Sequence, residues 1–110
     1  MSKTCTKCKQ ENIVSEIVKY QHKVLKSNHI DLSYTHNLKL PKELKYCSEI
    51  ESLNLSSSTI SETYIDLRKN KNLRYLDLSY CEMFYTKFTL DGLCNLSDID
   101  LTYSFWQNTN

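Results

Sequence analysis

The sequence predicts a small solenoid of the α/β class, in which short parallel strands on one side alternate with helical or irregular returns. A phrase of aliphatic, polar, aliphatic and hydroxyl residues occurs four times, each copy 23 residues after the last: Ile30–Ser33, Leu53–Ser56, Leu76–Ser79 and Ile99–Thr102. Self-similarity at a fixed period of this length is the signature of stacked repeats. Because strand side chains alternate between two faces, the two aliphatic residues of each copy are expected to point into a shared core.

A second recurrence concerns the segments between these phrases. Leucines stand at the same position of three successive repeats, Leu44, Leu67 and Leu90, and are expected to line the core on the convex side. The segments 59–72 and 82–95 must carry the chain back before the next parallel strand begins. We therefore expect them to form short helical or irregular returns.

A third recurrence extends the phrase toward its amino end. Three of the four copies have an aliphatic residue three places earlier, giving L-x-x-L-x-L: Ile50, Leu73 and Leu96. The pattern resembles that of the leucine-rich repeat family, from about Ile30 to Trp106. The resemblance implies a parallel sheet on the concave side of the solenoid and about four repeats.

One repeat position departs from the family pattern. Where the family usually has Asn or Cys, nine residues into the repeat, the chain has small side chains of which three are hydroxyls: Thr35, Ser58, Cys81 and Ser104. Such hydroxyls can hydrogen-bond to nearby backbone. The departure makes the repeats less regular, but it leaves the strand assignment unchanged.

The organisation expected from the sequence is one repeat domain with short additions at each end. Residues 1–10 are polar and predicted to be disordered, and residues 11–26 carry apolar side chains at helical spacing, which predicts an amphipathic helix capping the first repeat. The repeat domain covers residues 27–106, and residues 107–110 form a polar tail. Phe105 and Trp106 are expected to fold over the last repeat, since Trp106 matches Met83 in repeat position.

Composition excludes some classes of function. The net charge of +1 predicts no general attraction to nucleic acid or membranes, and no apolar run could span a bilayer or serve as a secretion signal. We expect a cytoplasmic protein with reduced thiols, in which Cys47, Cys81 and Cys94 are buried. One glycine cannot build a phosphate-binding loop, and no catalytic set is spaced recognisably, so neither an enzyme nor a cofactor is predicted.

The candidate site consists of the polar residues on the exposed face of the predicted sheet. They fall in two rows across the strands: His29, Ser52, Tyr75 and Asp98, and then Asp31, Asn54, Asp77 and Asp100. We predict that this face binds a partner protein. Self-association through the edge of the last strand is a further expectation, because an unpaired edge favours strand pairing.

Two other functions stay open. Leucine-rich repeats often serve in substrate recognition by ubiquitin-ligase adaptors, although residues 11–26 are too short for the F-box-like segment of such proteins. A zinc-binding nucleic-acid module is the other alternative, with four candidate ligands: Cys5, Cys8, His22 and His29. Their spacing narrowly misses that of a two-Cys, two-His finger, which must bring four ligands to one tetrahedral ion.

Overall fold

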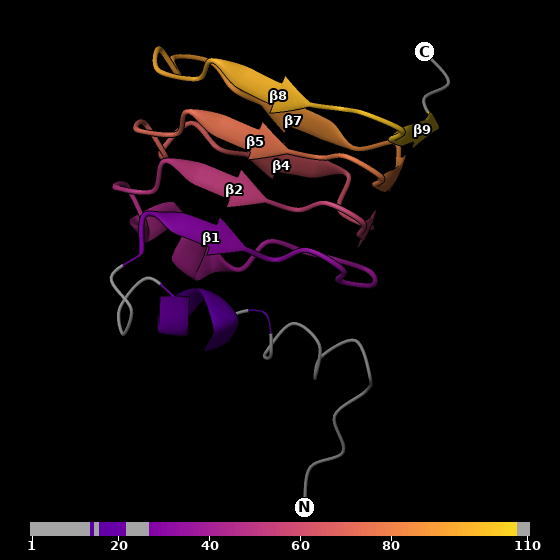
Figure 1. Ribbon diagram of the computed structural model, residues 1–110, viewed down its shortest axis with the longest axis horizontal. Helices are drawn as coiled ribbons and strands as arrows, with labels where there is room; N and C mark the ends of the chain where they lie inside the picture. Colours follow the sequence, from indigo (N-terminus) through magenta and orange to yellow (C-terminus); the bar gives the residue numbers. More distant parts are fainter. Residues whose placement is uncertain (1–13, 15, 22–26, 108–110) are drawn as a thin grey trace, which may run out of the picture.

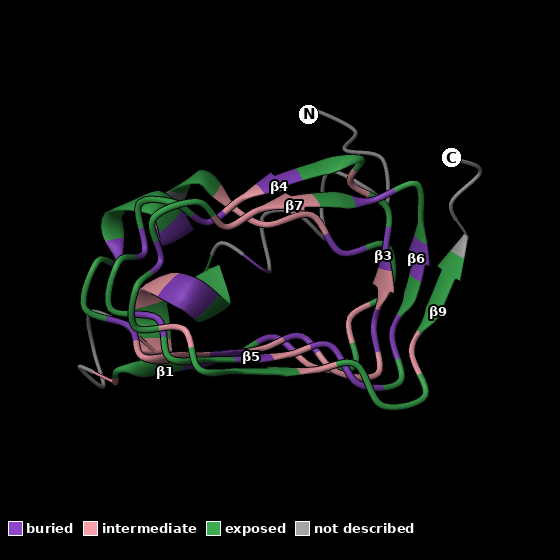
Figure 2. Ribbon diagram, turned by 90° about the horizontal axis from the view of Figure 1, so that it is seen from above, coloured by how far each residue is buried: buried purple, intermediate pink, exposed green. Residues whose placement is uncertain are grey.

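The chain folds as a parallel β-solenoid of about three turns. The computed structural model describes Val14, residues 16–21 and residues 27–107 of the 110-residue chain. Strands of successive turns stack beside one another along a single axis (Figure 1). Viewed along that axis, each turn is a flattened loop with strands on three of its sides (Figure 2).

The largest of the three sheets is built from the four repeated phrases. Its strands are β1 (His29–Asp31), β2 (Ser52–Asn54), β5 (Tyr75–Asp77) and β8 (Asp98–Asp100), in that spatial order. Every neighbouring pair is parallel and offset by 23 residues, so Ile30 lies beside Leu53. The predicted strand positions and register are therefore confirmed, and the central residue of each strand points to the inside of the loop.

The returns are extended rather than helical, and the α/β class predicted from the sequence is wrong for this part of the chain. They contribute a three-stranded sheet, β3 (Thr59–Ile60), β6 (Glu82–Phe84) and β9 (Phe105–Gln107), and a two-stranded sheet, β4 (Tyr64–Asp66) and β7 (Lys87–Thr89). These segments are rich in β-branched and aromatic residues, which suit a pleated, half-buried surface. Alternation over two or three residues was too short a signal to be recognised in the sequence.

The first return differs from the later ones. It contains the 3-10 helix η2 (Lys42–Tyr46), which follows Pro41. Lys42, Glu43 and Leu44 are residues that favour helix, and proline before the first turn suits a helix start. Among the described residues, this is the only return that contains a helix.

The predicted capping helix over residues 11–26 is only partly covered by the described residues. Val14 and residues 16–19 are helical, and Val14 and Val18 are buried within the same cluster as the repeat leucines. Residues 1–13, 15 and 22–26 lie outside the described residues, and with them the predicted disordered N-terminus and the ends of the helix. A complete capping helix is therefore not supported.

The core is one continuous apolar column. Its members come from all three sheets and from the turns between them: Ile30, Leu32, Leu38, Leu44, Ile50, Leu53, Leu55, Ile60, Ile65, Leu67, Leu73, Leu76, Leu78 and Met83, among others. Leu44 and Leu67 are buried as predicted, and Leu90 is partly buried against the same cluster. Cys47 and Cys81 are also buried, but Cys94 is exposed, so the prediction for that thiol is wrong.

Burial falls at the last turn. Ile99 and Leu101 hold the positions of Leu76 and Leu78, yet 43% and 46% of their surfaces are exposed. Trp106 lies in register with Met83 and packs edge-on against Phe88, with ring centroids 6.1 Å apart. Because Phe105 and Trp106 both keep exposed surface and do not cover Ile99 or Leu101, the predicted sealing of the core is wrong.

Polar side chains satisfy the backbone inside the loops. At the ninth repeat position, the Thr35 hydroxyl donates to the Leu32 carbonyl oxygen (2.7 Å), and the Cys81 thiol donates to that of Leu55 (2.9 Å). Asn70, which the sequence analysis did not single out, is 1% exposed and donates from its amide nitrogen to two carbonyls of the preceding turn. The Cys81 thiol and the Asn70 amide therefore tie adjacent turns together, while the Thr35 hydroxyl bonds within its own turn.

Candidate protein-binding face

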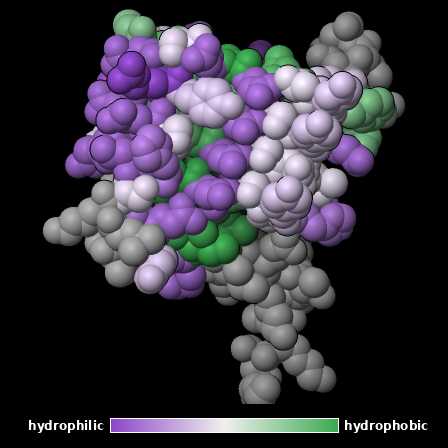
Figure 3. All heavy atoms as spheres, viewed as in Figure 1, coloured by the Kyte–Doolittle hydropathy of each residue, from purple (hydrophilic) through white to green (hydrophobic). Residues whose placement is uncertain are grey.

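The predicted site residues do lie together on one face of the four-stranded sheet. The parallel register sets them in two straight rows: His29, Ser52, Tyr75 and Asp98, and Asp31, Asn54, Asp77 and Asp100. Figure 3 looks onto this face, where hydrophilic residues stand on either side of a narrow strip of hydrophobic ones. We call it the outer face and include in it the residue two places after each strand: Ser33, Ser56, Ser79 and Thr102.

The second row has a structural role in every turn. In Asp31, Asn54, Asp77 and Asp100 alike, side-chain Oδ1 accepts a hydrogen bond from the backbone N–H two residues later, at 2.9 Å. This local bond satisfies a backbone donor at the point where the strand ends and the chain turns. The sequence analysis assigned these residues to partner binding alone, and their turn-closing role explains much of their recurrence.

Hydrogen bonds from the hydroxyl and the backbone N–H of Thr102 lower the pKa of the Asp100 carboxyl, because they favour its charged form.

The side chains of the first row make fewer hydrogen bonds to the backbone than those of the second row. Nδ1 of His29 lies 2.7 Å from the Ser52 hydroxyl, while Tyr75 and Asp98 are exposed. Partial burial raises the pKa of the Tyr75 phenol, and the carboxylates of Asp77, Asp100 and Asp98 raise it further.

A third row of residues borders the outer face. It consists of the residues that follow the second row by three places, Tyr34, Ser57, Tyr80 and Tyr103. All four have left-handed backbone conformation, with φ between 56° and 60°. We call them the tyrosine row. Bulky side chains are uncommon in this region of the backbone map, which favours glycine and asparagine.

The tyrosine side chains project into solvent. Tyr34, Tyr80 and Tyr103 are 82%, 59% and 77% exposed. Their backbones are held in place: the N–H groups of Tyr34, Ser57 and Tyr80 each donate to a carbonyl oxygen of the next turn at 2.9 Å. The rings of Tyr80 and Tyr103 stack with centroids 5.3 Å apart. An ordered aromatic edge therefore runs along one side of the outer face.

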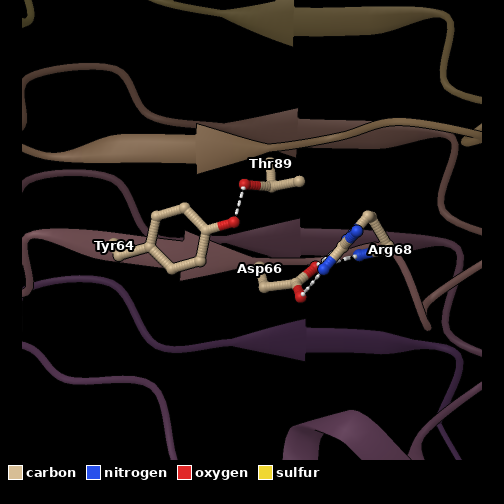
Figure 4. A network of polar contacts seen from close by, with 4 residues as sticks. All are labelled: Tyr64, Asp66, Arg68 and Thr89. Atoms are coloured by element: carbon tan, nitrogen blue, oxygen red, sulfur yellow. Dashed lines mark hydrogen bonds and ion pairs between the residues drawn. The ribbon is translucent and has the colours of Figure 1, made fainter.

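The two-stranded sheet carries a separate polar cluster (Figure 4). Arg68 donates from Nε to Oδ1 of Asp66 (2.9 Å) and from Nη2 to Oδ2 (2.7 Å). These bonds hold the pKa of the Asp66 carboxyl well below its usual range and raise that of the guanidinium. Nearby, the Thr89 hydroxyl donates to the phenol oxygen of Tyr64 (2.7 Å). Since each charge has its partner within the cluster, we assign it a structural role.

The zinc alternative gains no support. Cys5, Cys8 and His22 lie outside the described residues, and His29 stands on β1 beside Ser52. Among the residues that the structure describes, no three His, Cys, Asp or Glu side chains are grouped so as to hold a metal ion.

No helix in the described ranges has the length and apolar character needed to cross a membrane.

The chain is similar to two curated plant disease resistance proteins. The chain is 30% identical over 92 residues to the disease resistance protein UNI of Arabidopsis thaliana, a match that covers 83% of this chain. It is 31% identical over 71 residues, or 64% of the chain, to a probable disease resistance protein of the same plant. The chain spans about 9% of the length of each relative. No protein-family model matches it, and no solved structure matches it.

Proposed function

We propose that this chain is a leucine-rich repeat module, without enzymatic activity, that binds a partner protein through its outer face and tyrosine row. The solenoid fold and the similarity to disease resistance proteins fit a repeat module of this kind. We also propose that the chain is located inside the cell. The two buried cysteines, Cys47 and Cys81, are free thiols, which suits a reducing compartment.

The observation that carries the proposal is the exposure of the tyrosine row. Tyrosine combines a large contact area with a hydroxyl group and few rotatable bonds, and it is enriched at the centres of protein interfaces. Here three tyrosines stand in solvent at a backbone conformation that does not favour them. Packing within the fold does not require these rings, because Ser57 fills the same position between Tyr34 and Tyr80.

The proposal is tested by site-directed photo-crosslinking. A photoreactive amino acid at Ser56, in the row of the outer face next to the tyrosine row, is expected to crosslink a partner in an extract of the source cells. The same group at Lys69, in the turn after β4, is the matched control and is expected to yield much less product. Equal crosslinking from both positions, or none from Ser56, would contradict binding at the outer face.

A second copy of the chain is a further candidate partner. β8 lies at the edge of the four-stranded sheet as described, next to the exposed Ile99 and Leu101. A two-fold pair centred on Ile99 would run the two β8 strands antiparallel and set Asp98 of one copy opposite Asp100 of the other. Like charges in that position oppose pairing. Sedimentation at low and high salt tests this, since any dimer should form preferentially at high salt.

A further inference from the structure

We infer that the partner's docking segment is basic, and that its arginine side chains lie flat against the tyrosine row. This inference rests on the proposed function and goes beyond it by naming the chemistry of the partner. It draws on the arrangement of the rings and on the distribution of charge over the chain.

The tyrosine row provides separated ring faces. Adjacent strands are about 4.8 Å apart, and Ser57 occupies the turn between Tyr34 and Tyr80, so the backbones that carry these two rings are about 10 Å apart along the row. The small side chain of Ser57 leaves the space between them open to a side chain from a partner. On the far side of this gap, Tyr80 stacks on Tyr103, which supports the ring.

Charge on the outer face has a single sign. The outer face and the tyrosine row together contain four aspartates. They contain no lysine and no arginine. The whole chain nevertheless carries 14 Lys and Arg and a net charge of +1. Lys42, Lys45 and Arg68 lie in the returns instead. The outer face therefore attracts a basic segment and repels nucleic acid and anionic membranes.

The neighbouring carboxylates favour arginine over lysine. Asp31 and Asp77 stand three residues before Tyr34 and Tyr80, in the second row of the outer face, and close their turns through Oδ1. These turn bonds use Oδ1 alone, so the inference assigns Oδ2 to a hydrogen bond from an arginine side chain of the partner. A guanidinium group can stack on an aromatic ring and donate to a carboxylate at the same time, because it is planar. An ammonium group acts as a point charge and gains less from the ring.

The test uses three fluorescein-labelled peptides of equal length, in which serine alternates with arginine, lysine or glutamate. Anisotropy titration of the full chain is expected to show saturable binding of the arginine peptide. The lysine peptide is expected to bind several-fold more weakly, and the glutamate peptide not at all. Added salt should weaken the binding without abolishing it, because ring stacking is not screened.

Variants assign the binding to the row. In the Tyr34→Ser, Tyr80→Ser double variant, arginine-peptide affinity is expected to fall by about tenfold. The variant should fold, since Ser57 holds the same left-handed conformation in the parent chain; the thermal unfolding midpoint verifies this. Tyr46→Ser is the matched control, because Tyr46 is equally exposed but stands on η2, and it should leave affinity unchanged.

Some outcomes would overturn the inference. Equal affinity for the lysine and arginine peptides, or arginine-peptide binding that the double variant does not weaken, would reduce the effect to general charge attraction. Tighter binding of a labelled DNA duplex than of the arginine peptide would also overturn it. If no peptide binds but Ser56 still crosslinks a partner, the inference of a basic partner is wrong and the proposed protein binding is kept. If no peptide binds and Ser56 crosslinks nothing, the proposed binding at the outer face is wrong as well.

Discussion

Oδ1 of Asp77 accepts two hydrogen bonds from Ser79, one from its backbone N–H (2.9 Å) and one from its hydroxyl (2.7 Å). The same backbone bond recurs at Asp31, Asn54 and Asp100. The side chains proposed for partner binding therefore also close the turn after each strand. A substitution there changes both charge and local structure unless it keeps an acceptor in place.

Asp77→Ala should lower the free energy of unfolding by about 1 kcal/mol, because it removes the acceptor from a backbone N–H at the end of β5. Asp77→Asn is expected to cost much less, since Asn54 performs this role in the neighbouring turn. Urea unfolding followed by circular dichroism measures both. Equal losses for the two variants would show that the charge, and not the acceptor, stabilises the turn.

The period of 23 residues was enough to predict the four-stranded sheet, because each residue there pairs with its repeat equivalent. The returns were mispredicted for a physical reason. The leucine spacing correctly indicated that the returns reach the core. Strands β3 and β4, however, form because they pair with β6 and β7, and the local sequence around Thr59 and Tyr64 does not indicate this pairing. The left-handed backbone conformation of the tyrosine row was not predicted, because nothing in a tyrosine signals it.

Leu78 and Leu101 hold the same place in their repeats, yet only Leu78 is buried on both sides. Leu78→Ala should therefore lower the free energy of unfolding by about 2–5 kcal/mol, because it opens a cavity between turns. Leu101→Ala is its matched control and should cost less than about 1 kcal/mol, since the side chain is already half exposed. Similar losses would mean that repeat position, and not the presence of neighbours, determines burial.

Tyr34 is the most exposed residue of the tyrosine row, and its φ is 60°. Tyr34→Asn should raise the free energy of unfolding by up to about 1 kcal/mol, because asparagine tolerates this backbone conformation better. Tyr46→Asn, at an exposed residue without positive φ, is the control and should bring no gain. A stabilised variant that loses peptide binding would indicate that the tyrosine is kept for contact and not for folding.

The lowered pKa of Asp100 makes part of the stability dependent on pH. Its folded pKa lies below the unfolded value of about 3.9, so it stabilises the fold above that pH and ceases to do so as the pH falls through the folded pKa. Asp100→Asn keeps an acceptor for Thr102 but does not titrate. Its free energy of unfolding should fall less steeply than that of the parent below about pH 4. Asp98→Asn, on the same strand, controls for loss of charge, and an unchanged slope in Asp100→Asn would contradict the assignment.

Asn70 offers the sharpest test of how the turns are held together. Its amide nitrogen donates to the carbonyl oxygens of Leu44 (2.9 Å) and Cys47 (3.2 Å) from a position that is 1% exposed. Asn70→Asp replaces this donor by a carboxylate, which repels both carbonyls when it is charged. The free energy of unfolding should therefore be about 3 kcal/mol lower than that of the parent at pH 7. The difference should shrink as the pH falls, because a protonated carboxyl can donate a hydrogen bond again. Asn70→Leu introduces the side chain that Leu93 has at the same repeat position. It removes the donor from the next turn but leaves each carbonyl its backbone hydrogen bond, and its loss should be independent of pH. If the two variants share one pH profile, the amide does not link the turns.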